Sequence, residues 1–257
     1  MSTTIQLTSD LHLDRKIEKC DYKDRTITDS IFSRYIIPSA QVLILSGDIC
    51  DTTRGCDELY ELFIDWCCAR FEQVVLVAGN HEFFHTSIDA GLKYLKSLEE
   101  TRNNFRFLEK DHVEFHDVVI LGTTMWSYVP EDCEKLVRNY MNDFNCIEDM
   151  TTEKWKRMHM EAREWLSENI KRFNKKRIVV ATHHTPEMDK SMPPKYRGSP
   201  LNCAFGTDMS EFFDKVDVWV SGHTHWSDMI QLNTCKLYLN CGSDRIDRYK
   251  SDLVVFK

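Results

Sequence analysis

The segment Val42-Leu-Ile-Leu-Ser-Gly-Asp-Ile-Cys-Asp51 shows the pattern on which this chain is built. Its apolar run, Val42–Leu45, has no alternation of polar and apolar side chains, which indicates a β-strand buried on both faces. The run ends at Gly47-Asp48, so a carboxylate stands directly after the strand. Four other apolar runs end in the same way: Ile5–Thr8 before Asp10-Leu-His12, Val74–Ala78 before Gly79-Asn80-His81-Glu82, Ile178–Ala181 before Thr182-His183-His184, and Val216–Val220 before Gly222-His223-Thr224-His225.

Helical stretches separate these apolar runs. Apolar residues recur every three or four positions in three places, which is the spacing of one helix face. The three stretches are marked by Leu59, Leu62, Phe63 and Trp66, by Ile88, Leu92, Leu95 and Leu98, and by Trp155, Met158, Ala162, Trp165 and Leu166. Alternation of strands and helices in the first part of the chain predicts βαβ units with right-handed crossovers. Because the carboxyl ends of such strands line one edge of a sheet, we expect the polar residues after the runs to gather there.

Six further apolar runs complete the predicted architecture. They are Phe105–Leu108, Val113–Phe115, Val118–Gly122, Met229–Leu232, Lys236–Asn240 and Leu253–Phe256. The last three are closely spaced and are expected to be antiparallel. The chain is therefore predicted to be α/β, a four-layer αββα sandwich of two facing mixed β-sheets flanked by helices, with a single domain over residues 1–257. Residues 123–150 and 186–206 show no clean period and are expected to form irregular, cap-like segments that carry function.

Composition argues against several classes of protein. A formal charge of −8 argues against broad binding of duplex nucleic acid, which depends on many Lys and Arg side chains. No apolar stretch reaches the ~18–20 residues that a membrane-spanning helix needs. The sequence begins without a signal-peptide pattern, so its ten cysteines are expected to be reduced thiols in the cytoplasm.

The five polar motifs become specific when they are taken together. Each alone is common in turns, but their order is Asp-x-His, Gly-Asp-x-x-Asp, Gly-Asn-His-Glu, His and Gly-His-x-His, each after a predicted buried strand. In this order the chain resembles the calcineurin-like metallophosphoesterase superfamily. The resemblance covers Ile5 to about Ser243. The segment from Thr182 to Phe205 looks like a compact bacterial and phage branch without a defined substrate.

The resemblance implies a binuclear metal centre. Asp10, His12, Asp48 and His225 would hold one ion, whereas Asn80, His183 and His223 would hold the other, with Asp48 bridging the two. Oxygen and nitrogen ligands without thiolates suit two divalent ions of Mn, Fe or Zn. Such ions would clamp a phosphoryl group and activate a shared bridging water for in-line attack on phosphorus.

The resemblance also implies roles for residues that bind no metal. His81 would act as the general acid that protonates the leaving oxygen, or hold a phosphate oxygen, and Asp51 would orient His81 and keep it protonated. Either half of the pair His183-His184 could be a ligand from its position alone. The family pattern favours His183, which leaves His184 behind the ligands, facing substrate, or in a structural role.

Substrate contacts are predicted on the irregular segments and near the motifs. Arg54 resembles, loosely, the arginine that grips phosphate in protein serine/threonine phosphatases, although Thr52 and Thr53 intervene here. Lys195 and Arg197 could supply substrate charge. Trp126, together with Tyr128, could stack on a base, although a cap that packs on itself would show the same residues.

The function predicted from the sequence is metal-dependent hydrolysis of a small or accessible phosphate ester. A phosphodiester of nucleotide type is slightly favoured. The alternatives are a phosphomonoesterase or protein phosphatase, then a nuclease, then a metal-binding scaffold without catalysis. A scaffold of this family would be expected to lack ligands or the acid histidine, and all of these residue types are present.

Overall fold

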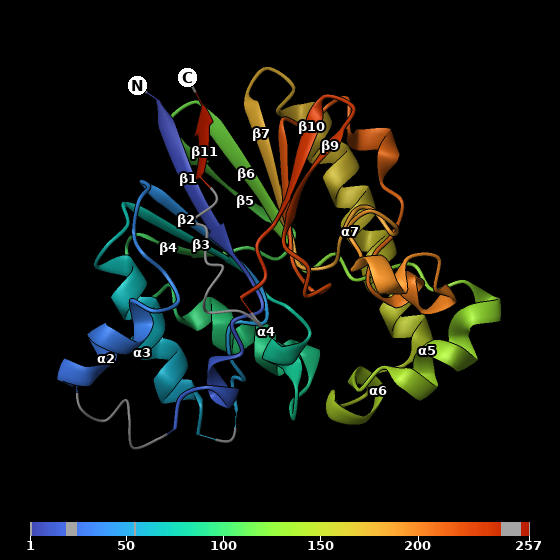
Figure 1. The fold of residues 1–257 in the computed structure, drawn as a ribbon, viewed down its shortest axis with the longest axis horizontal. Coiled ribbons are helices and arrows are strands. Elements are labelled where there is room, and N and C mark those ends of the chain that lie inside the picture. The colour runs from blue at the N-terminus through green and yellow to red at the C-terminus, as the bar shows by residue number, and fades with distance from the viewer. Residues whose placement is uncertain (1, 19–24, 54, 243–252, 257) are drawn as a thin grey trace.

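The computed structural model describes residues 2–18, 25–53, 55–242 and 253–256. Within these residues, two β-sheets face each other, one with five strands in the order β11-β1-β2-β3-β4 and one with six in the order β5-β6-β7-β8-β10-β9. Helices cover the outer face of each sheet (Figure 1). The predicted αββα sandwich is therefore confirmed.

The first sheet is built from the βαβ units predicted in the first part of the chain. β1 (Thr3–Thr8), β2 (Val42–Ser46), β3 (Gln73–Val77) and β4 (Phe105–Phe107) are parallel, and β11 (Leu253–Phe256) is antiparallel to β1. The helices beside it are α2 (Arg25–Phe32), α3 (Asp57–Cys68) and α4 (Ile88–Ser97). Leu43 and Leu45 of β2 pack in a cluster with Phe63 of α3, whereas Val42 and Ile44 pack between the sheets. Burial on both faces explains why the run has no alternation.

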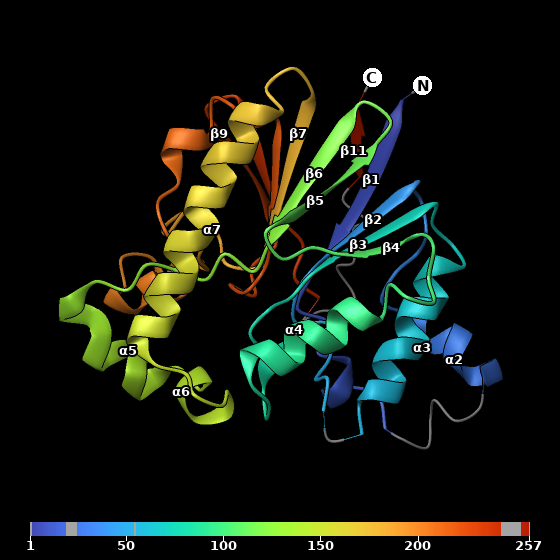
Figure 2. The ribbon, with the colours of Figure 1, turned by 180° about the vertical axis from the view of Figure 1, so that it is seen from behind.

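The second sheet carries the later motifs. β6 (Val118–Thr123), β7 (Arg177–Thr182), β8 (Val218–Ser221) and β10 (Cys235–Leu239) are parallel, and the edge strands β5 (Asp111–Phe115) and β9 (Asp228–Leu232) are antiparallel to their neighbours. α7 (Thr152–Arg172) lies along the outer face (Figure 2). Its residues Ala162 and Leu166 pack with Val180 of β7. The helix begins at Thr151, whose hydroxyl accepts a hydrogen bond from the Lys154 N–H.

Strand pairing differs from the prediction at three places. The run at Phe105–Leu108 pairs with β3 in the first sheet as β4, and not with the two runs that follow it along the chain. β9 and β10 are antiparallel as predicted, but β10 is also parallel to β8, and β11 is antiparallel to β1 of the first sheet instead of joining β10. Closeness in the sequence suggested local hairpins. However, the apolar faces of these strands are buried by elements that are distant along the chain.

The two irregular segments contain short helices that lie beside each other. The first holds η3 (Glu131–Cys133), α5 (Glu134–Tyr140) and α6 (Asp143–Cys146), and the second holds η4 (Pro194–Tyr196) and η5 (Pro200–Ala204). η5 contacts both η3 and α5. We call residues 123–150 the first cap segment and residues 186–206 the second. The remaining turns are η1 (Leu13–Arg15), η2 (His81–Phe83) and η6 (Ser210–Phe212).

None of the helices in the described part of the chain combines the length and the apolar character that crossing a membrane requires. The single-domain organisation stays a prediction.

Candidate metal centre

Side chains from both sheets meet where the parallel strands end. Asp10 follows β1, Asp48 follows β2 and Asn80 follows β3 in the first sheet. His183 follows β7 and His223 follows β8 in the second sheet. Residues that are up to 213 positions apart are thereby brought into hydrogen-bond distance, as between the His223 N–H and Asp10. This is the gathering that the strand-end motifs predicted.

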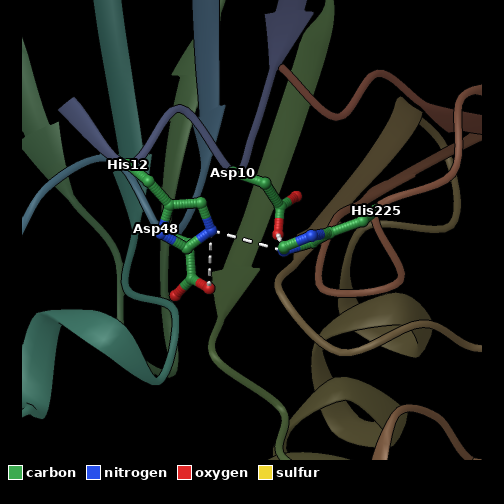
Figure 3. A group of neighbouring side chains, drawn as sticks. All are labelled: Asp10, His12, Asp48 and His225. Carbon is green, nitrogen blue, oxygen red and sulfur yellow. Dashed lines mark hydrogen bonds and ion pairs between the residues drawn. The ribbon is translucent and has the colours of Figure 1, made fainter. Parts of the chain in front are cut away.

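Asp10 and Asp48 form a first group with two further side chains, His12 and His225. One ligand atom from each lies within 4.8 Å of the others. The two histidine Nε2 atoms are 3.3 Å apart. His12 Nε2 lies 3.8 Å from an Asp48 oxygen, and His225 Nε2 lies 3.4 Å from an Asp10 oxygen. Figure 3 shows the four side chains pointing toward one another.

A second group contains Asp48, His183 and His223. His183 Nε2 lies 3.1 Å from His223 Nδ1 and 3.1 Å from the Asn80 Oδ1. It also lies 3.4 Å from Asp48 Oδ1. Because the other Asp48 oxygen, Oδ2, faces His12 of the first group, Asp48 presents one oxygen to each group. This is the arrangement expected of a bridging ligand.

The donor set fits divalent ions. The His183 Nδ1–H donates to the Ser46 carbonyl at 2.8 Å, which leaves Nε2 as the atom that can bind a metal. Burial lowers the pKa of His12 to about 4, so its ring is neutral and keeps a lone pair. Burial would raise the pKa of Asp48, but the attraction of His183 and His81 outweighs it and holds this pKa well below its usual range. Burial would lower the pKa of His183, but Asp48 outweighs it and raises this pKa to about 10, so the ring would give up its Nε2 proton when an ion binds. Imidazole nitrogens beside carboxylate and amide oxygens suit Mn, Fe or Zn.

The backbone at the centre is strained in a way that the sequence did not reveal. Positive φ angles occur at five of the seven predicted ligands: Asp10 (53°), His12 (44°), Asp48 (56°), His223 (67°) and His225 (52°). Such conformations cost roughly 1–3 kcal/mol each in non-glycine residues and concentrate at functional sites. The surrounding fold therefore holds the ligands in place against local preference.

Two glycines allow these ligands to approach the backbone. A Cβ atom at Gly79 would lie 2.1 Å from Asp48 Oδ1, and one at Gly222 would lie 2.6 Å from Asp10 Oδ2. Neither position has room for a side chain. The glycine in the Gly-Asn-His-Glu and Gly-His-x-His motifs is thus explained by packing against a ligand.

Glu82 holds the loops that carry the ligands. Its carboxylate is buried and accepts backbone hydrogen bonds from Asp48 (2.9 Å), Ile49 (2.8 Å) and Gly79 (2.7 Å), and another from the Tyr60 hydroxyl (3.3 Å). Burial raises the pKa of Glu82 to about 7. Glu82 belongs to the Gly-Asn-His-Glu motif, but its role could not be predicted because a local pattern does not show which loops a carboxylate will reach.

His81 lies beside the centre, but its partner is not the predicted one. Its backbone N–H donates to Asp48 Oδ1 at 2.9 Å, and its Nε2 is 3.8 Å from Asp48 Oδ2. Its Nδ1 accepts from the Arg15 guanidinium at 3.3 Å. Since a guanidinium can only donate, the proton of the neutral ring lies on Nε2, facing the ion groups. Sequence reasoning missed Arg15, which belongs to none of the motifs.

The predicted pairing of His81 with Asp51 is wrong. Asp51 accepts from the backbone N–H and the hydroxyl of Thr53, both at 2.8 Å, and lies 3.9 Å from the His85 ring. The pKa of His81 is lowered by burial, opposite to the direction that an Asp51 contact implied. Thr53 follows Asp51 by two residues and forms a local turn with it, which competes with any contact to His81.

His184 is buried beside the second group. Among the described residues, neither of its ring nitrogens has a hydrogen-bond partner. Its ring centre lies 4.3 Å from that of His223 and 5.3 Å from that of Trp126. The sequence left open whether His184 lies behind the ligands, faces substrate or has a structural role. The observed position is behind the ligands and does not face substrate.

The predicted substrate contacts are mostly not at the centre. Trp126 is 3% exposed and packs against Phe83 and Trp155, so it is part of a core and cannot stack on a base. Tyr128 is 44% exposed, but its ring lies near Lys156 and does not line the cavity that opens over the centre. Here the alternative of a cap packing on itself was correct for Trp126.

The two cations predicted to contact substrate in the second cap segment, Lys195 and Arg197, also lie outside the lining of this cavity. Lys195 Nζ is 4.6 Å from the centre of the Tyr196 ring, and Arg197 donates to the backbone carbonyls of Met192 and Lys190. The predicted contact at Arg54 lies outside the described residues.

A cavity of about 460 Å³ opens over the centre. Its floor is formed by ligands of both groups and by His81. The cap segments and Phe84 form its walls, with the residues Phe84, Tyr140, Met141, Asn142, Asp143, Met192, Pro193, Tyr196, Ser199, Leu201, Asn202 and Phe205. The irregular segments thus border the site, but through residues other than those predicted.

The sequence profile of calcineurin-like phosphoesterases matches residues 3–227, which span every motif described above. The chain belongs to the calcineurin-like phosphoesterase family. Members of this family normally hold a dimetal centre, and the two groups joined by Asp48 are the candidate ligands for it.

Individual relatives of this calcineurin-like phosphoesterase are distant. An uncharacterized protein of Acanthamoeba polyphaga mimivirus is 24% identical over 210 residues, which cover 74% of each chain. Among solved structures, the phosphopantetheinyl hydrolase of Mycobacterium tuberculosis has a TM-score of 0.71 at 16% identity and covers 98% of this chain and 95% of its own. A dimetal phosphatase from Danio rerio has a TM-score of 0.53 at 14% identity, covering 92% and 86%. These structures share the fold.

Proposed function

We propose that this phosphoesterase hydrolyses a phosphodiester with the help of two divalent ions. The observation that carries the proposal is the placement of Asp48, whose two oxygens face two separate groups of nitrogen and oxygen ligands. Ions held there would polarise the phosphoryl group and activate a water for attack on phosphorus.

The residues of the chain have distinct tasks in this proposal. Asp10, His12 and His225 would hold one ion, and Asn80, His183 and His223 the other, in the sets that the motifs predicted. Glu82 fixes the loops after β2 and β3, so that Asp48 keeps its position between the groups. The strained φ angles support the proposal that these positions are set before substrate arrives.

His81 is proposed as the donor to the leaving oxygen. Its Nε2–H faces the ion groups, and its ring is held from the other side by Arg15 and by Phe84, whose ring centre is 4.1 Å away. Arg15 is itself half-exposed at the same edge. We therefore propose Arg15, in place of Lys195 or Arg197, as the cation nearest to a bound phosphate.

The cavity wall favours a diester over a monoester. A diester carries one negative charge and two organic groups, so the group that is not displaced needs a surface to rest on. Phe84, Met141, Met192, Leu201 and Phe205 provide such a surface directly above the ligands. The similar structures are those of a phosphopantetheinyl hydrolase and of a phosphatase, which leaves the choice between diester and monoester open.

The test compares bis-p-nitrophenyl phosphate with p-nitrophenyl phosphate. The full chain is stripped with a chelator, and one portion is reloaded with Mn²⁺ while another is left without metal. We expect turnover only after reloading, with a higher kcat/KM for the diester. A preference for the monoester would support the phosphatase alternative, and metal-dependent turnover of neither substrate would support the scaffold.

We further propose that the reaction takes place in the cytoplasm. All nine cysteines in the described ranges are free thiols, a state that a reducing compartment preserves.

A further inference from the structure

The mouth of the cavity carries two exposed aromatic side chains. Tyr140, the last residue of α5, is 68% exposed, and Tyr196, the last residue of η4, is 53% exposed. Each comes from a different cap segment, and both line the cavity above the ligands. Large apolar side chains left in solvent at a concave site commonly mark a binding surface.

Tyr196 is held in place by its neighbours. Its N–H donates to the Pro193 carbonyl at 2.8 Å, and its own carbonyl accepts from the Asn202 side chain at 2.9 Å. Lys195 Nζ lies 4.6 Å from the centre of its ring. The proline at the start of η4 further restricts the backbone. The backbone that carries this ring is therefore fixed, while the ring itself stays exposed at the cavity. Little backbone entropy would be lost when the ring binds a ligand.

Two more rings lead from the mouth to the ligands. Phe84 packs on His81, and Phe205 packs on His223 with ring centres 4.8 Å apart and an interplanar angle of 33°. The side chains beside them, Asn142, Ser199 and Asn202, are polar but uncharged. Asp143 also lines the cavity but is buried, at 1% exposed. Apart from this buried carboxyl group, the described wall is aromatic and apolar with a few neutral hydrogen-bonding groups.

We propose that the organic group retained on the phosphate is an uncharged planar ring system, such as a nucleobase carried by its sugar, and that Tyr140 and Tyr196 bind it by stacking. This inference rests on the phosphodiesterase function proposed above. Stacking on an aromatic side chain tolerates any base because every base has a π-face. A cavity of about 460 Å³ lies within the usual size range for small-molecule sites.

The experiment uses two diesters that share charge and leaving group. Thymidine 5′-(p-nitrophenyl phosphate) and methyl p-nitrophenyl phosphate both release nitrophenolate, so the ratio of their kcat/KM values reports on the thymidine alone. For the Mn²⁺-loaded chain we expect a ratio of about 10 or more in favour of the thymidine ester. Tyr140→Ala and Tyr196→Ala should each lower this ratio several-fold, and the double variant should bring it close to 1.

Tyr128→Ala is the matched control, because Tyr128 is an exposed tyrosine of the first cap segment that lies outside the cavity lining. It should leave the ratio unchanged. Since all three tyrosines are exposed, the variants should fold, which their melting temperatures check.

The outcomes separate the two proposals. A wild-type ratio near 1, or a ratio that both cavity variants leave unchanged, would overturn the stacking inference. In that case, turnover of the methyl diester would still support the phosphodiesterase function. If neither diester is turned over, the proposed function fails. Calorimetric binding of thymidine 5′-monophosphate then decides the inference: weaker binding by both cavity variants supports it, and equal affinity overturns it.

Discussion

His81 is the residue whose surroundings differ most from what its motif implied. The carboxylate expected beside it lies with Thr53 and His85, and the guanidinium of Arg15 occupies that side of the ring instead. The ring thereby presents Nε2–H toward the ion groups. A donor in this position matters most when the leaving oxygen needs a proton.

The variant His81→Ala should therefore slow substrates unequally. We expect a loss of about 10²–10⁴-fold for a dinucleotide, whose leaving alkoxide must be protonated. Bis-p-nitrophenyl phosphate should lose far less, because nitrophenolate leaves without a proton. Steady-state kcat values for the two substrates measure this, with His112→Ala as a control remote from the cavity. Equal losses for both substrates would remove the donor role.

At the scale of single residues, the sequence identified the candidate ligands but not their neighbours. Asp48, His183 and His223 could be predicted because each directly follows a strand, and strand ends converge in such a fold. Arg15, Glu82 and Tyr196 could not, since their roles depend on which distant loop lies opposite. Trp126 was assigned to substrate because an aromatic residue in an irregular segment has the same local pattern whether it is buried or exposed.

The loops after β2 and β3 are joined by one buried carboxylate. Glu82 accepts three backbone N–H groups, from Asp48, Ile49 and Gly79. Removing it would leave three buried donors unpaired, at a cost of about 1–3 kcal/mol each.

We expect Glu82→Ala to lower the free energy of unfolding by about 3 kcal/mol or more at pH 8. Tyr60→Phe, which removes only the hydroxyl that also contacts Glu82, should cost about 1 kcal/mol. Urea unfolding of the metal-free chains measures both values. Losses of similar, small size in the two variants would show that Glu82 does not hold the loops together.

The helix α7 contains a buried histidine that should make stability depend on pH. Burial lowers the pKa of His159 to about 4, and its Nδ1 lies 3.3 Å from the Met125 carbonyl. The unfolded chain, with a pKa near 6.5, binds the proton more readily than the folded chain between these values. Stability is therefore complete above pH 6.5 and falls as the pH drops toward 4.

Replacing His159 with Phe should remove this part of the pH dependence. Between pH 7 and pH 5 we expect the wild type to lose about 2 kcal/mol more unfolding free energy than the variant. Urea titrations of both proteins at the two pH values provide the measurement. Parallel losses in the two proteins would exclude His159 as the cause.

Elements were predicted better than their pairing. Most strand and helix positions follow from apolar period, because burial on one or both faces sets that period. The partners of β4, β10 and β11 did not follow, since a strand's apolar residues show that it is buried without showing against which neighbour. The cap segments lacked a period because they contain short helices separated by turns.

In the whole molecule, the candidate metal centre takes side chains from both sheets of the sandwich. The first sheet supplies Asp10, Asp48 and Asn80, and the second supplies His183 and His223. Ions bound between them would therefore link the sheets and stabilise the folded chain in proportion to their affinity.

The measurement that tests the two-ion account most directly is the number of Mn²⁺ ions bound per chain. Chelator-stripped wild type and Asp48→Asn would be titrated by calorimetry, and the metal content of each would be measured after gel filtration. We predict two ions per wild-type chain and the loss of tight binding at both sites in the variant, because Asp48 is shared by both groups. One ion per wild-type chain, or two ions retained by Asp48→Asn with unchanged affinity, would contradict the account.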